Sequence, residues 1–241
     1  MAKKFAAFDI DGTLIRWQLY HAIADRLAKL GYVDTVAFNE IREARMDWKR
    51  RTHSESFKEY EIELVKLYER ILKELNVGHF EEAAESVFEE YKEQVYTYTR
   101  TLLKELKAKD YLLFAISGSQ TEIVKKIADY YGFDDFAGST YVQQDERFTG
   151  ELHTALGKKD IVLKRLAKKH QAGFKDSIAV GDGAGDIAML EIVENPIAFN
   201  PERKLFEEAS KQGWKIVIER KNMVYELEQG SGKYQLAKTN A

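Results

Sequence analysis

Two aspartates that could do chemistry, Asp9 and Asp11, stand two residues apart near the start of the sequence. An apolar run over 5–8 precedes them and Gly12 follows, which predicts a buried strand that ends in a turn. Proteins of the α/β class place their chemistry at such strand ends. Two close carboxylates can bind a divalent cation, divide the roles of nucleophile and acid, or do both.

Small and polar residues also follow two later apolar runs. Ser117-Gly118-Ser119 comes after the run 111–116, and a glycine-rich segment over 181–186 comes after the run 177–180. The carboxyl ends of parallel strands meet at one edge of a sheet. Parallel pairing of the three runs would therefore gather five polar side chains at one place: Asp9, Asp11, Ser117, Asp182 and Asp186.

Carboxylates that are packed together repel one another unless a cation offsets their charge. The side-chain donors in these clusters are all oxygen and include no histidine, which favours Mg²⁺ over zinc. Candidate ligands are Asp9, Asp182 and a backbone carbonyl near Asp11, with Asp186 in support. Taken alone, the segment 181–186 is explained equally well as a glycine-rich turn in which Asp186 caps a helix.

The serine cluster and a later lysine pair could hold a phosphate. A hydroxyl, the Gly118 amide and free amides at a helix start suit an anion, although the cluster taken alone is better explained as a simple helix cap by Ser119. Lys158 and Lys159 open a predicted helix, where the helix dipole disfavours a cation. One lysine turned inward would neutralise phosphate and carboxylates, whereas two exposed lysines would have no such role. Which lysine this is stays open.

The composition excludes several classes of site. The chain of 241 residues has no cysteine, so disulfides, thiolate zinc sites and a cysteine nucleophile are excluded. A net charge of -3, with 32% charged residues, gives no general attraction to nucleic acid or to an anionic membrane. The sequence shows neither a signal-peptide layout nor an apolar stretch near the ~20 residues that span a bilayer. We expect a cytoplasmic protein, and its oligomeric state is left open.

The order of apolar patterns predicts an α/β fold with a parallel, Rossmann-like sheet flanked by helices. Between the first strand and residue 97 the sequence is charged and helix-periodic, which predicts an all-helical insert over 17–96. The core would comprise 1–16 and 97–229, and the polar segment 230–241 would be a mobile tail. The other predicted elements are strands over 111–116, 177–181, 196–199 and, last, 215–218; helices over 99–109, 120–131, 158–169, 186–193 and 201–212; and a hairpin over 140–152.

These motifs, in this order, resemble the four motifs of the haloacid dehalogenase-like phosphatases. The residues that match these motifs are, in order, Asp9-Ile10-Asp11-Gly12-Thr13, Ser117, Lys159, and Gly181-Asp182 with Asp186. A helical insert directly after the first motif resembles the C1-cap type of this family. The runs that begin at Lys159 and Gly181 resemble its phosphoserine phosphatase-like branch.

The resemblance implies a two-step, Mg²⁺-dependent phosphomonoesterase. Asp9 would attack phosphorus and form an aspartyl-phosphate, and Asp11 would act as general acid and then as general base. Family ATPases carry threonine at the position of Asp11, so this aspartate favours hydrolysis. The remaining implied roles are Mg²⁺ binding by Asp9, Asp11 and Asp182, phosphate binding by Ser117, Gly118 and Lys159, and support of the metal by Asp186.

The departures from the branch concern the substrate. Phosphoserine phosphatases carry a glutamate that meets the substrate amine, and Gln18 stands there beside Trp17, so these two are candidates for leaving-group contacts. The aligned part of the insert, 56–65, has Lys58 but lacks the family's arginine, and Gly185 replaces an asparagine. A small phosphorylated metabolite other than phosphoserine is therefore expected. The aromatic residues that could line a pocket, or only pack the insert, are Trp17, Tyr20, Trp48, Phe57 and Tyr60.

Two alternatives use the same residues. A phosphomutase or phosphotransferase could use the same nucleophile and return the phosphoryl group to an organic acceptor. A protein with weak catalysis that binds phosphate or metal and presents a helical interaction surface is the second alternative. Gly185 and the unfamiliar insert leave this alternative open, while intact Asp9 and Asp11 count against it.

Overall fold

The structure is a computed structural model of the 241-residue chain. It describes residues 2–230 and 233–240, and at Ala37 the backbone alone. The chain forms two compact units, which are described separately. The first, the core unit, comprises Met1–Gln18, Glu90–Ser139 and Thr154–Ala241, and the second, the helical unit, comprises Leu19–Glu89 and Thr140–His153.

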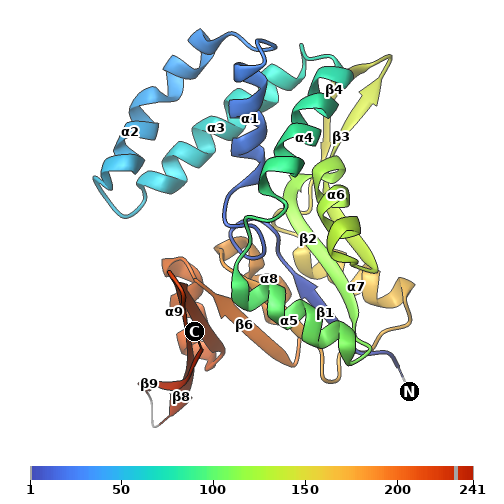
Figure 1. The fold of residues 1–241 in the computed structure, drawn as a ribbon, viewed down its shortest axis with the longest axis vertical. Coiled ribbons are helices and arrows are strands. Elements are labelled where there is room, and N and C mark those ends of the chain that lie inside the picture. The colour runs from blue at the N-terminus through green and yellow to red at the C-terminus, as the bar shows by residue number, and fades with distance from the viewer. Residues whose placement is uncertain (1, 231–232, 241) are drawn as a thin grey trace. The chain divides into compact units, whose positions relative to one another are not determined.

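A twisted sheet forms the centre of the core unit (Figure 1). Its strand order is β3-β2-β1-β5-β6-β7-β8-β9, with parallel pairing from β3 to β7 and antiparallel pairing at β8 and β9. The parallel, helix-flanked sheet confirms the predicted fold class. The strand bounds are β1 Phe5–Phe8, β2 Leu112–Gln120, β3 Asp135–Gln144, β5 Ile178–Gly181, β6 Asn195–Phe199, β7 Lys215–Arg220, β8 Met223–Gly230 and β9 Lys233–Asn240.

Helices cover both faces of this sheet, because its central strands are apolar on both sides. All four residues of β1 are buried, and Phe5 and Ala7 belong to the core beneath α7 (Lys159–Lys169), α8 (Ile187–Leu190) and α9 (Arg203–Gln212). The opposite face packs against α5 (Thr97–Ala108) and α6 (Thr121–Tyr131). There, the Phe8 ring lies 6.0 Å from that of Phe133. These layers hold the ends of the strands in fixed positions.

The helical unit contains α1 (Leu19–Lys29), η1 (Thr35–Ile41), α2 (Arg42–Arg50), α3 (Ser56–Leu72) and most of α4 (Val77–Tyr91). It also contains the outer part of the hairpin made by β3 and β4 (Arg147–His153), which the sequence did not assign to the insert. The Phe80 and Phe148 rings lie 5.5 Å apart, and the Val77 amide donates to the Glu146 carbonyl at 2.9 Å. One ring contact and one backbone hydrogen bond thus connect the hairpin to α4, which is distant from it in sequence.

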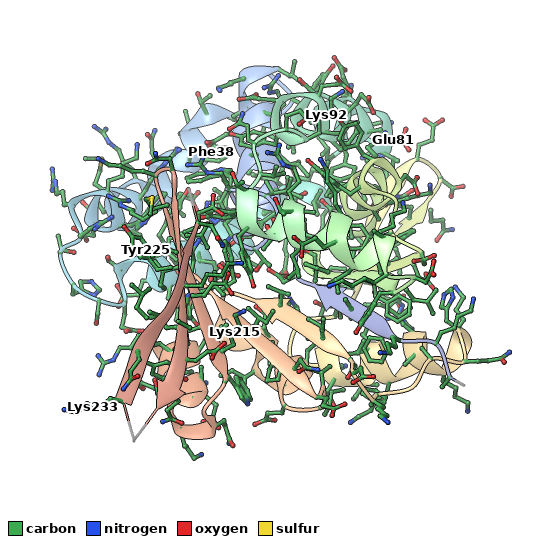
Figure 2. The ribbon with its side chains drawn as sticks, turned by 60° about the horizontal axis from the view of Figure 1, so that its bottom comes forward. Phe38, Glu81, Lys92, Lys215, Tyr225 and Lys233 are labelled. Atoms are coloured by element: carbon green, nitrogen blue, oxygen red, sulfur yellow. The ribbon has the colours of Figure 1, made fainter. Side chains whose placement is uncertain are left out.

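The end of the chain differs from the prediction. The prediction that β7 is the last strand was wrong, because β8 and β9 follow it, and Figure 2 shows Tyr225 on β8 and Lys233 on β9. In the segment predicted to be mobile, residues 233–240 form β9 and pair with β8, while residues 231, 232 and 241 lie outside the described residues. Among the described residues, no helix has the length and apolar character needed to cross a membrane.

Candidate active site

The end of β1 places Asp9 and Asp11. The Asp9 amide donates to the Val180 carbonyl of β5 at 2.9 Å, so parallel pairing continues up to the first aspartate. Gly12 then turns the chain with a φ of +78°. A Cβ atom at Gly12 would lie 2.1 Å from Oδ2 of Asp182, so only glycine allows this approach.

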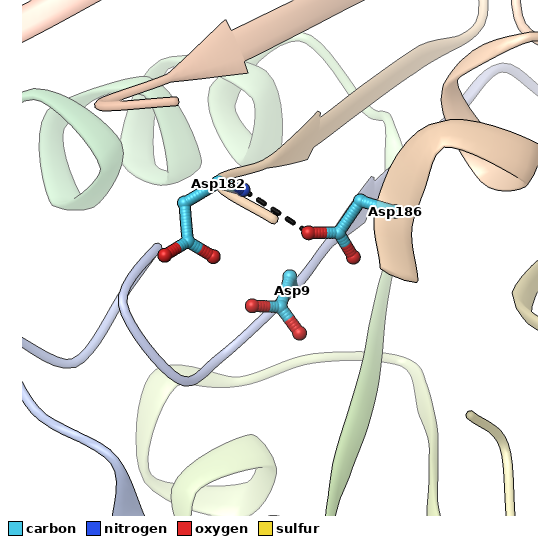
Figure 3. Close-up of side chains that lie close together, drawn as sticks. All are labelled: Asp9, Asp182 and Asp186. Carbon is cyan, nitrogen blue, oxygen red and sulfur yellow. Dashed lines mark hydrogen bonds between the residues drawn. The ribbon is translucent and has the colours of Figure 1, made fainter. Parts of the chain in front are cut away.

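Three carboxylates converge beside this turn (Figure 3). One oxygen each of Asp9, Asp182 and Asp186 lies within 4.8 Å of the others. Lys159, at the start of α7, points its Nζ atom to Oδ1 of Asp9 and to Oδ1 of Asp186, at 2.6 Å each. Lys159 is buried whereas Lys158 is exposed, so Lys159 is the lysine of the pair that lies at the site.

Asp186 shapes the turn after β5. Its Oδ2 atom accepts the Asp182 amide at 3.1 Å, drawn as a dashed line in Figure 3, and the Gly183 amide at 3.0 Å. Its Oδ1 atom meets Lys159. Asp186 therefore caps the turn and also lies in the carboxylate cluster. The interpretation of the segment 181–186 as a capped turn and its interpretation as part of a carboxylate cluster do not exclude each other.

Two serine hydroxyls hold the Asp11 carboxyl group. Ser117 Oγ lies 2.5 Å from Oδ2 of Asp11, and Ser119 Oγ lies 3.0 Å from Oδ1. Ser119 does not cap α6, because Gln120 occupies that position without a side-chain cap. The irregular register of β2 between Ile116 and Gln120 accompanies this arrangement. Ser119 is a site residue that sequence reasoning missed, and its spacing of two from Ser117 was the available signal.

Other contacts support the same turns. Thr13 Oγ1 donates to Oδ1 of Asp182 at 3.2 Å, and Thr99 Oγ1 donates to the Thr13 carbonyl at 2.9 Å. Thr13 therefore belongs to the site although it was not predicted as a site residue. At Gly118, a Cβ atom would meet Cδ2 of Leu156 at 2.5 Å, so glycine keeps this stretch of backbone close to its neighbour.

Burial dominates the electrostatics of the cluster. It raises the pKa of Asp9 to about 7, with Lys159 opposing and Asp186 and Asp11 adding to the rise. Burial, followed by the charges of Asp9 and Asp186, also raises the pKa of Asp182. For Lys159, burial lowers the pKa, but Asp186 and Asp9 outweigh it and raise the pKa overall.

One lysine is too little positive charge for this set of carboxylates. Asp9, Asp182 and Asp186 offer only oxygen donors within 4.8 Å of one another, and Lys159 is the cation paired with two of them. A hard divalent cation would lower the remaining repulsion. The residues present therefore fit Mg²⁺.

The remaining predicted site residues are less defined. The Gly12 amide donates to the Trp17 carbonyl at 3.2 Å, and both Trp17 and Gln18 are half-buried. A Cβ atom at Gly185 would meet nothing within 4 Å, so packing does not explain the absence of a side chain there. In the helical unit, Trp48 stacks on Tyr60 at 5.1 Å, and its ring lies 5.3 Å from Phe57.

Known proteins are similar to this chain in sequence and in fold. Residues 6–191 match the family described as haloacid dehalogenase-like hydrolase. Phosphoserine phosphatase from Lactococcus lactis subsp. lactis is 31% identical over 202 residues, which cover 82% of this chain and 84% of that protein. Phosphoserine phosphatase from Methanocaldococcus jannaschii is 27% identical over 226 residues, which cover 92% and 94%.

A solved structure shows the same fold. It is described as a phospho-aspartyl intermediate analogue of phosphoserine phosphatase, and it covers 92% of this chain and 95% of its own chain at 24% identity, with a TM-score of 0.62. The family match spans most of the chain and includes Asp9, Asp11, Lys159 and Asp182. The chain belongs to the haloacid dehalogenase-like hydrolases and, within them, to the phosphoserine phosphatase-like branch of phosphatases.

Proposed function

We propose that the chain is a Mg²⁺-dependent phosphomonoesterase that hydrolyses a small phosphorylated metabolite through an aspartyl-phosphate on Asp9. One observation carries the proposal: the buried Asp9 carboxylate pairs with Lys159 and has an oxygen within 4.8 Å of oxygens of Asp182 and Asp186, with Asp11 two residues along the chain. Carboxylates in different surroundings can divide the nucleophile and acid roles. Asp9 faces the lysine, and Asp11 faces the two serines.

In the first step, an Asp9 oxygen bonds to phosphorus and the bond from phosphorus to the leaving oxygen breaks. Asp11 gives its proton to that oxygen. In the second step, Asp11 takes a proton from a water molecule whose oxygen attacks the same phosphorus, which releases inorganic phosphate and restores Asp9. Ser117 and Ser119 can bond Asp11 in both protonation states, because a hydroxyl group donates as well as accepts.

The phosphoryl oxygens are assigned to Ser117, the Gly118 amide and Lys159. Such donors stabilise the charge of the transition state without reorganising. Mg²⁺ would be held by Asp9, Asp182 and the Asp11 carbonyl, with Asp186 in support. When bound, the metal offsets the negative charge of the carboxylates and the phosphate. Asp9 must be ionised to attack, and Lys159 at 2.6 Å favours that form.

The substrate assignment is a small phosphomonoester, with Trp17 and Gln18 as leaving-group contacts. The two relatives described above are phosphoserine phosphatases, and a histidinol-phosphatase from Neisseria meningitidis is also similar, at 25% identity. This chain has Gln18 where the branch has an acid, and no arginine in 56–65. A neutral amide would not compensate an ammonium group, so phosphoserine is disfavoured.

Hydrolysis of p-nitrophenyl phosphate tests the proposal. We expect activity that EDTA abolishes, Mg²⁺ restores and Asp9→Asn eliminates. Asp160→Asn is the matched control, because Asp160 lies on α7 and pairs with Lys164 outside the cluster. In Asp11→Asn the phosphorylated enzyme should accumulate and give a mass increase that maps to Asp9.

Two outcomes would contradict this mechanism. Full activity in Asp9→Asn would remove the covalent step. The second is turnover in H₂¹⁸O in which the phosphoryl group is found on an organic acceptor and no ¹⁸O-labelled phosphate forms. That result would show a phosphotransferase. A panel of phosphorylated metabolites compared by kcat/KM would then identify the substrate.

A further inference from the structure

A groove on the core unit lies outside the carboxylate site. It has a volume of about 460 Å³ and is lined by residues of α5 and α6 together with Glu93. Three of its lining residues are cations and two are tyrosines: Arg100, Lys104 and Lys107 from α5, and Tyr130 and Tyr131 from α6. A concave surface with this mixture is suited to an anionic ligand.

The cations form a row along α5. Arg100, Lys104 and Lys107 are spaced by four and then three residues, so they share one face of the helix. The row spans about 10 Å along the helix axis. Like charges at this spacing repel each other, and within 2–230 and 233–240 no carboxylate forms an ion pair with any of them. The row therefore carries uncompensated charge.

Other helices of the same unit pair some of their cations with a carboxylate of the same helix. Lys125 meets Asp129 at 2.5 Å on α6, Lys164 meets Asp160 at 2.9 Å on α7, and Arg203 meets Glu207 at 2.8 Å on α9. Each pair spans four residues of one helix. Among the described residues, α6, α7 and α9 each have at least one such pair, whereas α5 has none.

The groove has one carboxylate of its own, Glu93, which offsets part of the charge of the row but forms no ion pair with it among the described residues. Glu93 accepts a hydrogen bond from the Tyr130 hydroxyl group. A further cation, Lys92 directly after α4 (Figure 2), places its Nζ atom 5.6 Å from the centre of the Tyr130 ring. Lys107 has a local role as well, because its Nζ atom donates to the Gly132 carbonyl at the end of α6, at 3.2 Å. For the side chains of Arg100 and Lys104, the described residues supply neither an ion pair nor a hydrogen bond.

We propose that this groove binds a small oligophosphate, with Arg100 and Lys104 as the main contacts and Lys107 at one end. An oligophosphate carries several charges in a row, which matches cations that follow one another along a helix. The Tyr131 hydroxyl group stays neutral and so does not repel it, since burial raises the pKa of Tyr131 to about 12. This site is independent of the proposed phosphatase activity.

Calorimetric titration of the full chain with tripolyphosphate, at low salt and without Mg²⁺, tests the proposal. Leaving out Mg²⁺ disfavours binding of the anion at the catalytic cluster, where Lys159 faces the carboxyl groups of Asp9, Asp182 and Asp186. We expect Arg100→Gln combined with Lys104→Gln to raise the Kd about tenfold or more. Lys164→Gln combined with Lys168→Gln on α7 removes the same charge outside the groove and should change the Kd less than about twofold.

Several results would overturn the proposal. These are no binding by the natural chain, equal weakening by both double variants, or hexaglutamate binding as tightly as tripolyphosphate, which would indicate an acidic protein segment. If the double variant fails to fold, Lys104→Gln alone replaces it, because Lys104 is exposed, and an unchanged Kd there would count equally against the site. Hydrolysis of p-nitrophenyl phosphate should be the same in all these variants.

Discussion

The ammonium group of Lys159 lies 2.6 Å from the carboxylate of Asp9, and both side chains are almost fully buried. The same ammonium lies 2.6 Å from Asp186. Because desolvation disfavours each charge alone, this pairing is what allows Asp9 to ionise at a buried strand end. The charge of Asp9, the proposed nucleophile, therefore depends on a residue that is 150 positions away in sequence.

Removal of Lys159 should reduce catalysis strongly. Lys159→Ala leaves the buried carboxylates of Asp9 and Asp186 without their lysine and removes the proposed donor to the phosphoryl group. We expect kcat/KM for p-nitrophenyl phosphate to fall about 100- to 1,000-fold, as for other lost transition-state donors. Lys158→Ala is the matched control, because Lys158 is exposed, and it should change the rate little. Equal losses in both variants would contradict the assignment.

Binding of Mg²⁺ should release protons near neutral pH. The pKa of Asp9 is raised to about 7, so below pH 7 the free protein holds a proton that the metal must displace. The apparent Mg²⁺ affinity should fall as the pH drops through 7, by up to about tenfold per pH unit. Calorimetry at pH 6.5 in two buffers with different ionisation enthalpies would measure the proton release. Identical heats in the two buffers would show that Asp9 is already ionised in the free protein.

Ser119 should position Asp11 for proton transfer. Ser119→Ala removes one of the two hydroxyl groups that hold the Asp11 carboxyl group. A hydrogen bond of this kind contributes about 1 kcal/mol, so we expect kcat to fall about fivefold with KM nearly unchanged. In an Asp11→Asn background the same substitution should have little further effect. Full additivity of the two substitutions would show that Ser119 acts elsewhere.

Gly12 should tolerate no side chain. Gly12→Ala adds a Cβ atom 2.1 Å from Oδ2 of Asp182 at a φ of +78°. Gly157→Ala isolates the backbone strain, since Gly157 has a φ of +69° and nothing within 4 Å of the added atom. We expect Gly157→Ala to cost about 1–2 kcal/mol in urea unfolding. Gly12→Ala should cost more and should also weaken Mg²⁺ binding, whereas equal costs would mean that Asp182 moves aside freely.

The amino-acid sequence determined the fold class and most of the carboxylate cluster. Apolar runs at 5–8 and 111–116 are short and continuous, which is the pattern of strands covered on both faces. Because parallel strands share one carboxyl edge, Asp9, Asp182 and Asp186 could be expected together before any coordinates. The structure places them within 4.8 Å of one another.

Helix periodicity was less decisive in the helical unit. In α3 the apolar residue Ile62 is 45% exposed, whereas Tyr60 and Leu64 are buried. The chain has apolar residues on more than one face of this helix. Which face is covered depends on the neighbouring segments, and local spacing does not contain that information.

Only the tertiary structure decided which residues complete the site. Lys158 and Lys159 are neighbours of the same type, and the direction in which α7 starts turns Lys159 to the carboxylates. Ser119 looked like a helix cap until the irregular end of β2 turned its hydroxyl group to Asp11. Local pattern shows what kind of element a residue occupies, but the direction of its side chain is set by contacts with distant parts of the chain.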